Sequence, residues 1–122
     1  MSQFEKGIGG GNMKKVSELE GAELDYWVAR AEGYSDEQIT CRQREQPWTL
    51  RYLDWALGGP IIERERIELQ CGDAIGDGHT WFAHPAAIVD PNQPSQVGPT
   101  PLIAAMRCYV ASKFGETVPE EK

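Results

Sequence analysis

The order of hydrophobic and polar residues near the N-terminus predicts an amphipathic helix over residues 20–32. Its apolar positions recur at the i, i+3, i+4 and i+7 spacing of one helical face: Leu24, Trp27, Val28 and Ala31. Ser17 and Glu20 have the spacing of a capping box, in which each side chain bonds the other residue's backbone N–H. Gly33 follows the last apolar position, where a glycine commonly ends a helix.

A second apolar stretch predicts a helix that begins at Pro101. Thr100 is suited to cap it, and proline is well tolerated at the first helical position. The apolar positions are so many that we expect this helix to be buried around much of its circumference: Leu102, Ile103, Met106, Tyr109, Val110 and Phe114. Gly115 is expected to end the helix, and residues 116–122 to form a solvated tail.

The segment between these helices begins with a weaker pattern. Residues 34–46 are polar and show no clear period, whereas residues 49–57 predict a short helix. Gly58-Gly59-Pro60 predicts the end of that helix. Pro60 is then suited to start another one or two helical turns that reach Ile67.

Alternating polar and apolar residues predict strands over residues 66–71 and 80–83. The glycine-rich stretch 72–78 between them predicts a turn, so the two strands are expected to form an antiparallel hairpin. Residues 85–101 hold five of the eight prolines and predict an extended connection without regular structure. The expected fold class is α+β, with an N-terminal and a C-terminal helix packed on a small, mostly antiparallel sheet.

The length of 122 residues fits one domain. We expect the domain to span residues 13–118, after a flexible glycine-rich leader over residues 1–12 and before a disordered tail over residues 119–122. Three cysteines, an odd and widely spaced set, favour free thiols in a reducing cytoplasm. No apolar run approaches the roughly 20 residues that a membrane-spanning helix needs, so no membrane association is expected.

The net charge of the chain limits which kinds of partner are expected. The chain carries 12 Lys and Arg against 19 Asp and Glu, a formal net charge of −7. Binding to nucleic acid polymers depends on basic residues that neutralise phosphates, so that function class is not expected. The acidic residues do not form a dense run that would mimic DNA, and solubility is the simpler interpretation of the charge.

Three separated blocks of the chain read, in order, KKVSELEGAELDYWVARAEG, DWALGGPIIERERIEL and GPTPLIAAMRCYVASKFG. Together these blocks resemble the NinX-like small phage accessory proteins, and the resemblance covers nearly all of residues 13–118. The middle departs from the family, because residues 48–54 read WTLRYLD where members carry small hydroxyl residues. The resemblance implies a phage origin, location in the host bacterial cytoplasm and a fold of the α-β-α sandwich group, but it implies no reaction.

The residue patterns for metal binding and catalysis are weak. His79 and His84 are five positions apart and would point to opposite faces of a strand. Asp73 and Asp77 flank a glycine-rich turn but do not have the spacing of a calcium-binding loop. Ser112 lies within a predicted helix without the glycine pattern of a catalytic nucleophile. We therefore expect no metal, no cofactor and no enzymatic activity.

The block around Gly58 and Gly59 is the candidate binding site. If the chain breaks there, backbone N–H groups at the start of the following helix would be free to bind an anion. Tyr52 and Trp55 offer flat surfaces on which a base could stack. The other candidates in this site are Ile61, Glu63, Arg64 and Arg107. The alternative is structural: the glycines only break a helix, the apolar residues belong to the core, and Arg107 is a surface cation.

The resulting functional hypothesis is a non-enzymatic phage accessory protein that counters host defence by sequestering a small anionic, nucleotide-derived signal. The alternative is an antagonist that binds a host defence or recombination protein through an exposed aromatic or acidic patch. A chain of this size can form a pocket between copies, so a homo-oligomer is also considered.

Overall fold

The structure is a computed structural model that describes residues 12–72, 80–85 and 95–120. Predicted sites that include Asp73, Asp77 or His79, and the leader up to residue 11, lie outside the described residues. The α-helices are α1 Gly21–Ala31, α2 Asp36–Glu45, α3 Trp55–Glu65 and α4 Pro101–Phe114, and two short 3₁₀ turns are η1 Val16–Glu18 and η2 Pro47–Leu50. The strands are β1 Met13–Lys15, β2 Glu68–Gly72, β3 Thr80–His84, β4 Gln96–Gly98 and β5 Thr117–Pro119.

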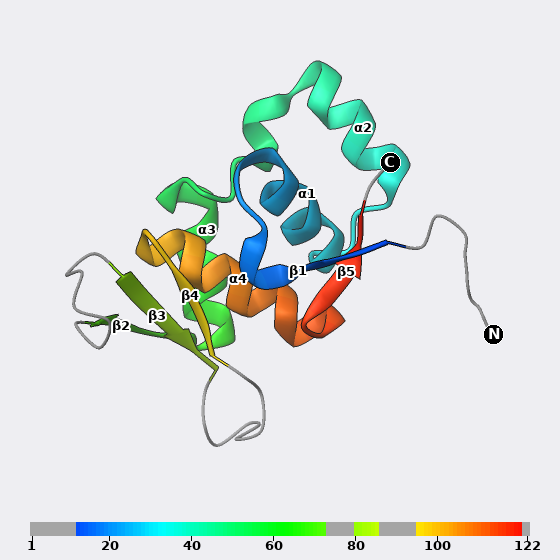
Figure 1. The fold of residues 1–122 in the computed structure, drawn as a ribbon. Coiled ribbons are helices and arrows are strands. Elements are labelled where there is room, and N and C mark those ends of the chain that lie inside the picture. The colour runs from blue at the N-terminus through cyan, green and yellow to red at the C-terminus, as the bar shows by residue number, and fades with distance from the viewer. Residues whose placement is uncertain (1–11, 73–79, 86–94, 121–122) are drawn as a thin grey trace.

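Helix α4 lies at the centre of the molecule and packs against the sheet β2-β3-β4, α1 and α3 (Figure 1). Thr100 caps it by accepting a hydrogen bond from Ile103 N–H at 3.1 Å, and Pro101 occupies its first turn, as predicted. The eight consecutive residues from Ala104 to Ala111 are buried, as is Leu102, which confirms the expected burial around its circumference. The α+β fold class is confirmed. Within the described residues, the layers run from sheet to α4 to α1 and α3, rather than in the α-β-α order implied by the resemblance.

The three-stranded sheet is antiparallel, with strand order β2-β3-β4. Its register runs from the pair Glu68 and His84 to the pair Gly72 and Thr80, which confirms the predicted hairpin. The prediction of a connection without regular structure over residues 85–101 is wrong at Gln96–Gly98, which forms β4 and pairs with β3. These three residues lie between prolines but have backbone N–H groups of their own, so they can pair with a strand. Their partner, β3, is not adjacent in sequence, so the local pattern does not reveal the pairing.

A second, two-stranded sheet joins the two ends of the described chain. β1 pairs with β5 in antiparallel fashion, and Met13 lies opposite Pro119. The prediction of a solvated tail from residue 116 is therefore wrong for Thr117–Pro119, and Val118 is fully buried. The same pairing brings Pro119 and Glu120 into the domain that was predicted to end at residue 118: Glu120 N–H donates to the Asn12 carbonyl at 3.0 Å.

Helix α1 confirms the first predicted helix, with Leu24, Trp27 and Val28 buried. Its end is also as predicted, because Gly33 follows it with φ of 107°, a conformation that favours glycine. The predicted capping box of Ser17 and Glu20 is wrong, since Ser17 belongs to η1 and the residue before the helix makes no side-chain capping bond.

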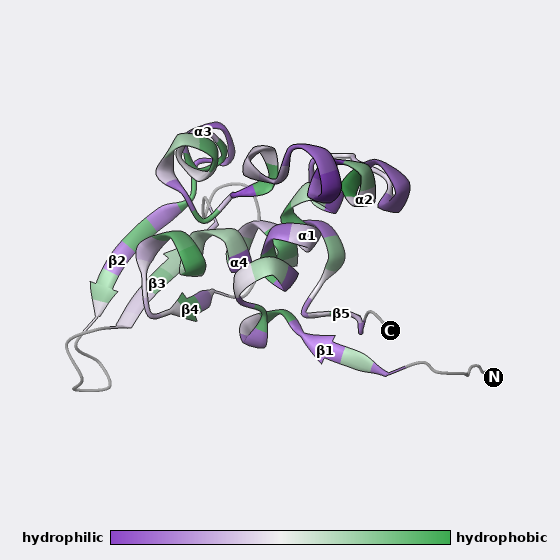
Figure 2. Ribbon diagram, turned by 90° about the horizontal axis from the view of Figure 1, so that it is seen from above, coloured by the Kyte–Doolittle hydropathy of each residue, from purple (hydrophilic) through white to green (hydrophobic). Residues whose placement is uncertain are grey.

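Helix α2 lies in the segment whose polar pattern predicted no element. Ser35 and Gln38 form a capping box, with Gln38 N–H donating to Ser35 Oγ at 3.1 Å and Ser35 N–H donating to Gln38 Oε1 at 2.8 Å. Ile39 is the one buried residue of this helix, and Figure 2 shows α2 as mostly hydrophilic. A helix that contributes one residue to the core leaves almost no hydrophobic period in the sequence.

Helix α3 runs without a break through Gly58, Gly59 and Pro60, so the predicted helix end at this block is wrong. Proline normally disfavours helical geometry in the residue before it, through a clash with that residue's Cβ. Gly59 has no Cβ, which removes much of this clash and lets the helix continue. The helix ends instead at Arg66, which adopts a left-handed conformation with φ of 57°.

Candidate functional site

A groove along the first half of α1 is the candidate functional site, and we call it the α1 groove. It consists of two adjoining cavities of about 730 and 310 Å³, which share Ala22, Asp25 and Arg51. The larger cavity is also lined by Gly21, Leu53, Asp54, Trp55, Thr100, Pro101 and Leu102. The smaller one is also lined by Tyr26, Gln43, Pro47 and Leu50. The α1 groove thus lies where the start of α1, the segment 50–55 and the start of α4 meet.

Asp25 fixes the segment that forms one wall of the α1 groove. Its Oδ1 accepts a hydrogen bond from Tyr52 N–H at 3.1 Å, and Leu53 N–H also bonds this carboxylate. Burial raises the pKa of Asp25 to about 6, although the bonds from Tyr52 and Leu53 and the charge of Arg51 act in the opposite direction. The carboxylate therefore carries a conformational role in the loop that precedes α3.

Trp55 stands at the rim of the α1 groove as the first residue of α3, and it is 55% exposed. Asp54 caps this helix by accepting a hydrogen bond from Ala56 N–H at 3.1 Å. Trp48 is exposed to a similar extent, 59%, but it lines neither cavity. The α1 groove therefore has one indole at its edge that a partner could cover.

The predicted anion site at Gly58 and Gly59 is not formed. Because α3 is continuous, Gly58 N–H is taken by the Asp54 carbonyl at 2.8 Å, and both glycines lie inside the helix. Gly58 is needed for packing instead: a Cβ there would collide with the Tyr52 carbonyl and would lie 2.6 Å from Leu102 Cδ2. Tyr52 itself is 6% exposed and belongs to the core, so its ring offers no stacking surface.

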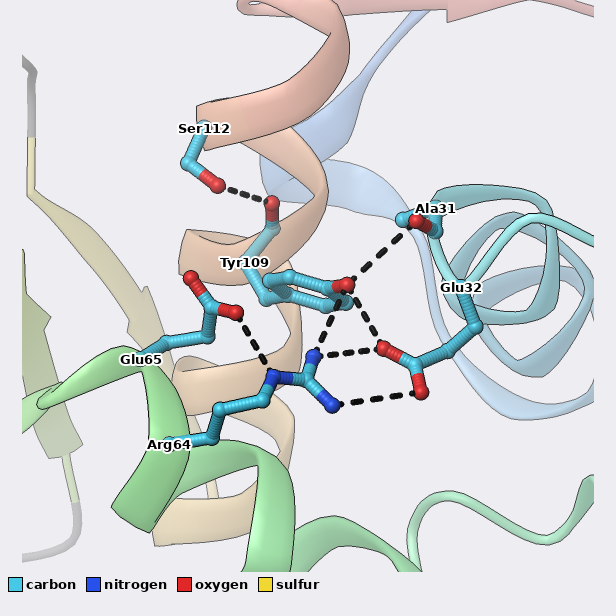
Figure 3. Close-up of polar contacts among 6 residues, drawn as sticks. All are labelled: Ala31, Glu32, Arg64, Glu65, Tyr109 and Ser112. Carbon is cyan, nitrogen blue, oxygen red and sulfur yellow. Dashed lines mark hydrogen bonds and ion pairs between the residues drawn. The ribbon is translucent and has the colours of Figure 1, made fainter.

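Arg64 is engaged in a polar cluster that joins the end of α1 to α3 and α4 (Figure 3). Its guanidinium bonds Glu32 at 2.6 Å, Glu65 at 2.8 Å and the Tyr109 hydroxyl at 3.1 Å. The Tyr109 hydroxyl also donates to Glu32 at 2.6 Å. Partial burial alone would raise the pKa of Glu32, but the bonds from Arg64 and Tyr109 outweigh it and lower that pKa. Arg64 is therefore neutralised within the protein.

The remaining candidates lie away from the α1 groove. Arg107 is 8% exposed, and its guanidinium donates to the Leu19 carbonyl at 2.8 Å and to the Val97 carbonyl at 2.7 Å. Arg107 is therefore not a surface cation, and its guanidinium links α4 to the residues before α1 and to β4. Burial lowers its pKa, and the charge of Glu20 partly offsets this shift. Ile61 belongs to the core, and Glu63 is exposed on α3.

Of the eight predicted site residues, Trp55 alone lines the α1 groove. Sequence reasoning missed Asp25 and Arg51. The sequence could have indicated Asp25, because this residue lies at the edge of a helical face that was expected to be buried. It directly follows Leu24 and lies three positions before Val28. A carboxylate at such an edge is often held by a hydrogen bond, here from the backbone of another segment.

The described residues, 12–72, 80–85 and 95–120, form neither a metal site nor a membrane-spanning helix. In these ranges, no three His, Cys, Asp or Glu side chains gather where they could hold a metal ion. Among the described helices, none combines the length and apolar character needed to cross a membrane. His84 lies on β3, where its Nδ1 is 2.5 Å from Ser95 Oγ.

Comparison with known proteins gives one family. Residues 15–113 match the family described as Bacteriophage P22, NinX, which covers most of the chain and includes all of α1 to β4 and nearly all of α4. No curated protein matches the sequence.

Proposed function

The chain belongs to the Bacteriophage P22 NinX family and is a phage accessory protein, and we propose that it counters host defence by binding a host protein through the α1 groove. In this proposal it acts without catalysis, in the host cytoplasm. The observation that carries it is Trp55, which is half exposed at the rim of a mainly apolar groove.

An exposed tryptophan beside apolar side chains is a common anchor for a protein partner. Residues that contribute most to protein–protein binding are enriched in Trp, Tyr and Arg and tend to fill pockets. Trp55 and Arg51 belong to this class, and Leu53 and Pro101 supply adjacent apolar contact. Covering the exposed part of the indole would remove apolar surface from water at about 25 cal/mol per Å².

A nucleotide-derived signal is the second candidate ligand. The larger cavity, about 730 Å³, is within the size range of small-molecule sites, and stacking on Trp55 would contribute about 1–3 kcal/mol per base. The charges favour it less, because Asp25 and Asp54 face the same cavity as the single cation Arg51. An anion would also need free backbone N–H groups, but the N–H of Gly58 already donates to the Asp54 carbonyl.

Affinity capture from infected host cells, compared among the wild type, Trp55→Ala and Trp48→Ala, tests the protein-binding proposal. We expect one host protein to be recovered in stoichiometric amount by the wild type and by Trp48→Ala, and to be lost with Trp55→Ala. The Trp48 variant is a matched control, because it removes an equally exposed indole that lies outside both cavities. Equal recovery by all three proteins would contradict the use of this groove.

A thermal-shift panel of cyclic dinucleotides and ADP-ribose derivatives tests the second candidate. A ligand at 100 times its dissociation constant stabilises a protein by about 2.7 kcal/mol, so a true ligand gives a clear rise in melting temperature. The rise should vanish in Trp55→Ala, and a flat panel would exclude these compounds. Sedimentation of the wild type and Trp55→Ala tests whether a second copy of the chain covers the groove instead.

A further inference from the structure

The α1 groove has an elongated outline that suits an extended segment of a partner. Its two cavities share Ala22, Asp25 and Arg51, while Pro101 lines only the larger cavity and Gln43 only the smaller one. A ligand that follows both cavities must therefore pass along α1 rather than sit at a single point. An extended peptide has this form and presents successive side chains in alternating directions.

The larger cavity is lined by two carboxylates, Asp25 and Asp54, and by one cation, Arg51. Asp54 and Trp55 line only this cavity, and Asp25 lies where it meets the smaller one. Backbone N–H groups hold both carboxylates: Ala56 bonds Asp54 and Tyr52 bonds Asp25, each at 3.1 Å. Charged groups that are already held in position lose little side-chain freedom when a partner binds.

The indole of Trp55 adds a second feature that attracts a cation. Tryptophan is the aromatic side chain that binds cations best over its ring face. Asp54 precedes Trp55 directly and lines the same cavity, so a carboxylate and an exposed indole border one space. The overall charge of −7 favours the approach of a basic partner in the same way.

We infer that the α1 groove binds a partner segment in which an arginine or lysine stands next to an apolar side chain. The basic side chain lies in the larger cavity beside Asp54 and Trp55, and the apolar side chain packs on Leu53 and Pro101. Arg51 repels a second cation at the junction of the cavities, which selects for a single basic residue at that end. This inference rests on the proposed protein-binding function and specifies the partner's chemistry.

Selection of random 12-residue peptides displayed on yeast, against the full-length chain, tests this inference directly. We expect enrichment of peptides with Arg or Lys beside an aromatic or aliphatic residue. The affinities of synthetic copies should fall at least about tenfold with Trp55→Ala and several-fold with Asp54→Asn, and should weaken as salt is raised. Asparagine caps helices as well as aspartate does, so Asp54→Asn removes the charge while it keeps the start of α3.

Two variants provide matched controls: Trp48→Ala removes an exposed indole, and Glu63→Gln removes an exposed carboxylate of α3, both outside the cavities. Neither should change peptide affinity. Failure to select peptides, enrichment of acidic or uncharged peptides, or equal affinity for Asp54→Asn and Glu63→Gln would overturn the inference. The proposed function would still stand if Trp55→Ala abolished capture of the host protein, so the two failures are distinguishable.

Discussion

At the scale of single residues, Gly58 sets how closely α3 approaches the rest of the protein. A methyl group at this position would meet the Tyr52 carbonyl, which is backbone, as well as Leu102. We expect Gly58→Ala to lower the free energy of unfolding by about 1–3 kcal/mol, the usual cost of overpacking, as measured by urea denaturation.

Gly59→Ala is the matched control for that measurement. The nearest atom to its added methyl group would be Trp55 Cε3 at 3.8 Å, an ordinary contact. Alanine favours a helix by about 0.5–1 kcal/mol over glycine, while the following proline opposes a Cβ here, so the net change should stay below about 1 kcal/mol. Equal destabilisation by both variants would contradict the packing role of Gly58.

Asp25 makes stability depend on pH in a defined direction. Burial raises its pKa from 3.8 to about 6, so between these values the folded protein holds a proton that the unfolded chain has released. The stabilisation that comes from this extra bound proton is complete below pH 3.8 and is lost as the pH rises through about 6. Asp25→Asn keeps an oxygen for the Tyr52 N–H and does not titrate, so its stability relative to the wild type should increase from pH 4 to pH 7.

Asp25→Ala separates the charge of Asp25 from its hydrogen bonds. Without the carboxylate, Leu53 N–H loses its acceptor and Tyr52 N–H keeps only the Leu50 carbonyl at 2.9 Å. A buried donor that loses its acceptor costs about 1–3 kcal/mol. We therefore expect this variant to be less stable than Asp25→Asn at every pH, in thermal or urea unfolding. A pH-independent difference between Asp25→Asn and the wild type would contradict the raised pKa.

At the scale of elements, the cluster around Arg64 joins three helices whose contact is not local in sequence. Glu32 follows α1, Arg64 belongs to α3 and Tyr109 to α4. A double-mutant cycle of Arg64→Met and Glu32→Gln should give a coupling energy of about 0.5–1 kcal/mol at pH 7, because the pair is partly exposed. The exposed pair Arg44 and Glu45, 3.7 Å apart, is a control that should show almost none.

Acid should remove this coupling. The pKa of Glu32 is lowered in the folded protein, so its contribution is present above its ordinary value of 4.5 and is lost as the pH falls through the lowered value. The same cycle, measured at a series of falling pH values, should therefore give a coupling energy that decreases. A coupling that is unchanged in acid would show that the hydrogen bonds act without the carboxylate charge.

The sequence predicted those elements whose signals are local. α1 and α4 combine a clear apolar face with a glycine after their ends, and α4 adds Thr100 and Pro101 at its start. α2 escaped prediction because it buries only Ile39, and β1, β4 and β5 because three-residue strands are stabilised by partners distant in sequence. α3 was misread because Gly59 relieves a clash with Pro60 instead of ending the helix.

The candidate site was less predictable than the fold. Trp55 could be singled out as a large aromatic residue near the Gly58 and Gly59 block, and it does line the α1 groove. Asp25, Arg51 and Pro101 join it only through the packing of α1 against the segment 50–55 and α4. Arg64 could not be recognised as neutralised, since Glu32 is 32 positions away in the sequence.

At the scale of the whole molecule, the reactivity of the three cysteines measures whether the protein is folded. Cys41 and Cys71 are exposed, whereas Cys108 is buried in α4, where burial raises its pKa to about 11. A thiol reagent should therefore modify two cysteines of the native protein rapidly and the third only on unfolding, because the thiolate is the reactive form. Counting modified thiols with and without urea checks this, and rapid native reaction of all three would contradict the burial of α4.

The pairing of β1 with β5 leaves the two ends of the described chain antiparallel and hydrogen-bonded, with Glu120 beside Asn12. This is the arrangement that a two-residue Asn-Gly turn closes in a β-hairpin. A backbone circle that joins residue 120 to residue 12 through such a turn should fold as the linear protein does. Because a closed chain has fewer unfolded conformations, the circle should also melt at a higher temperature.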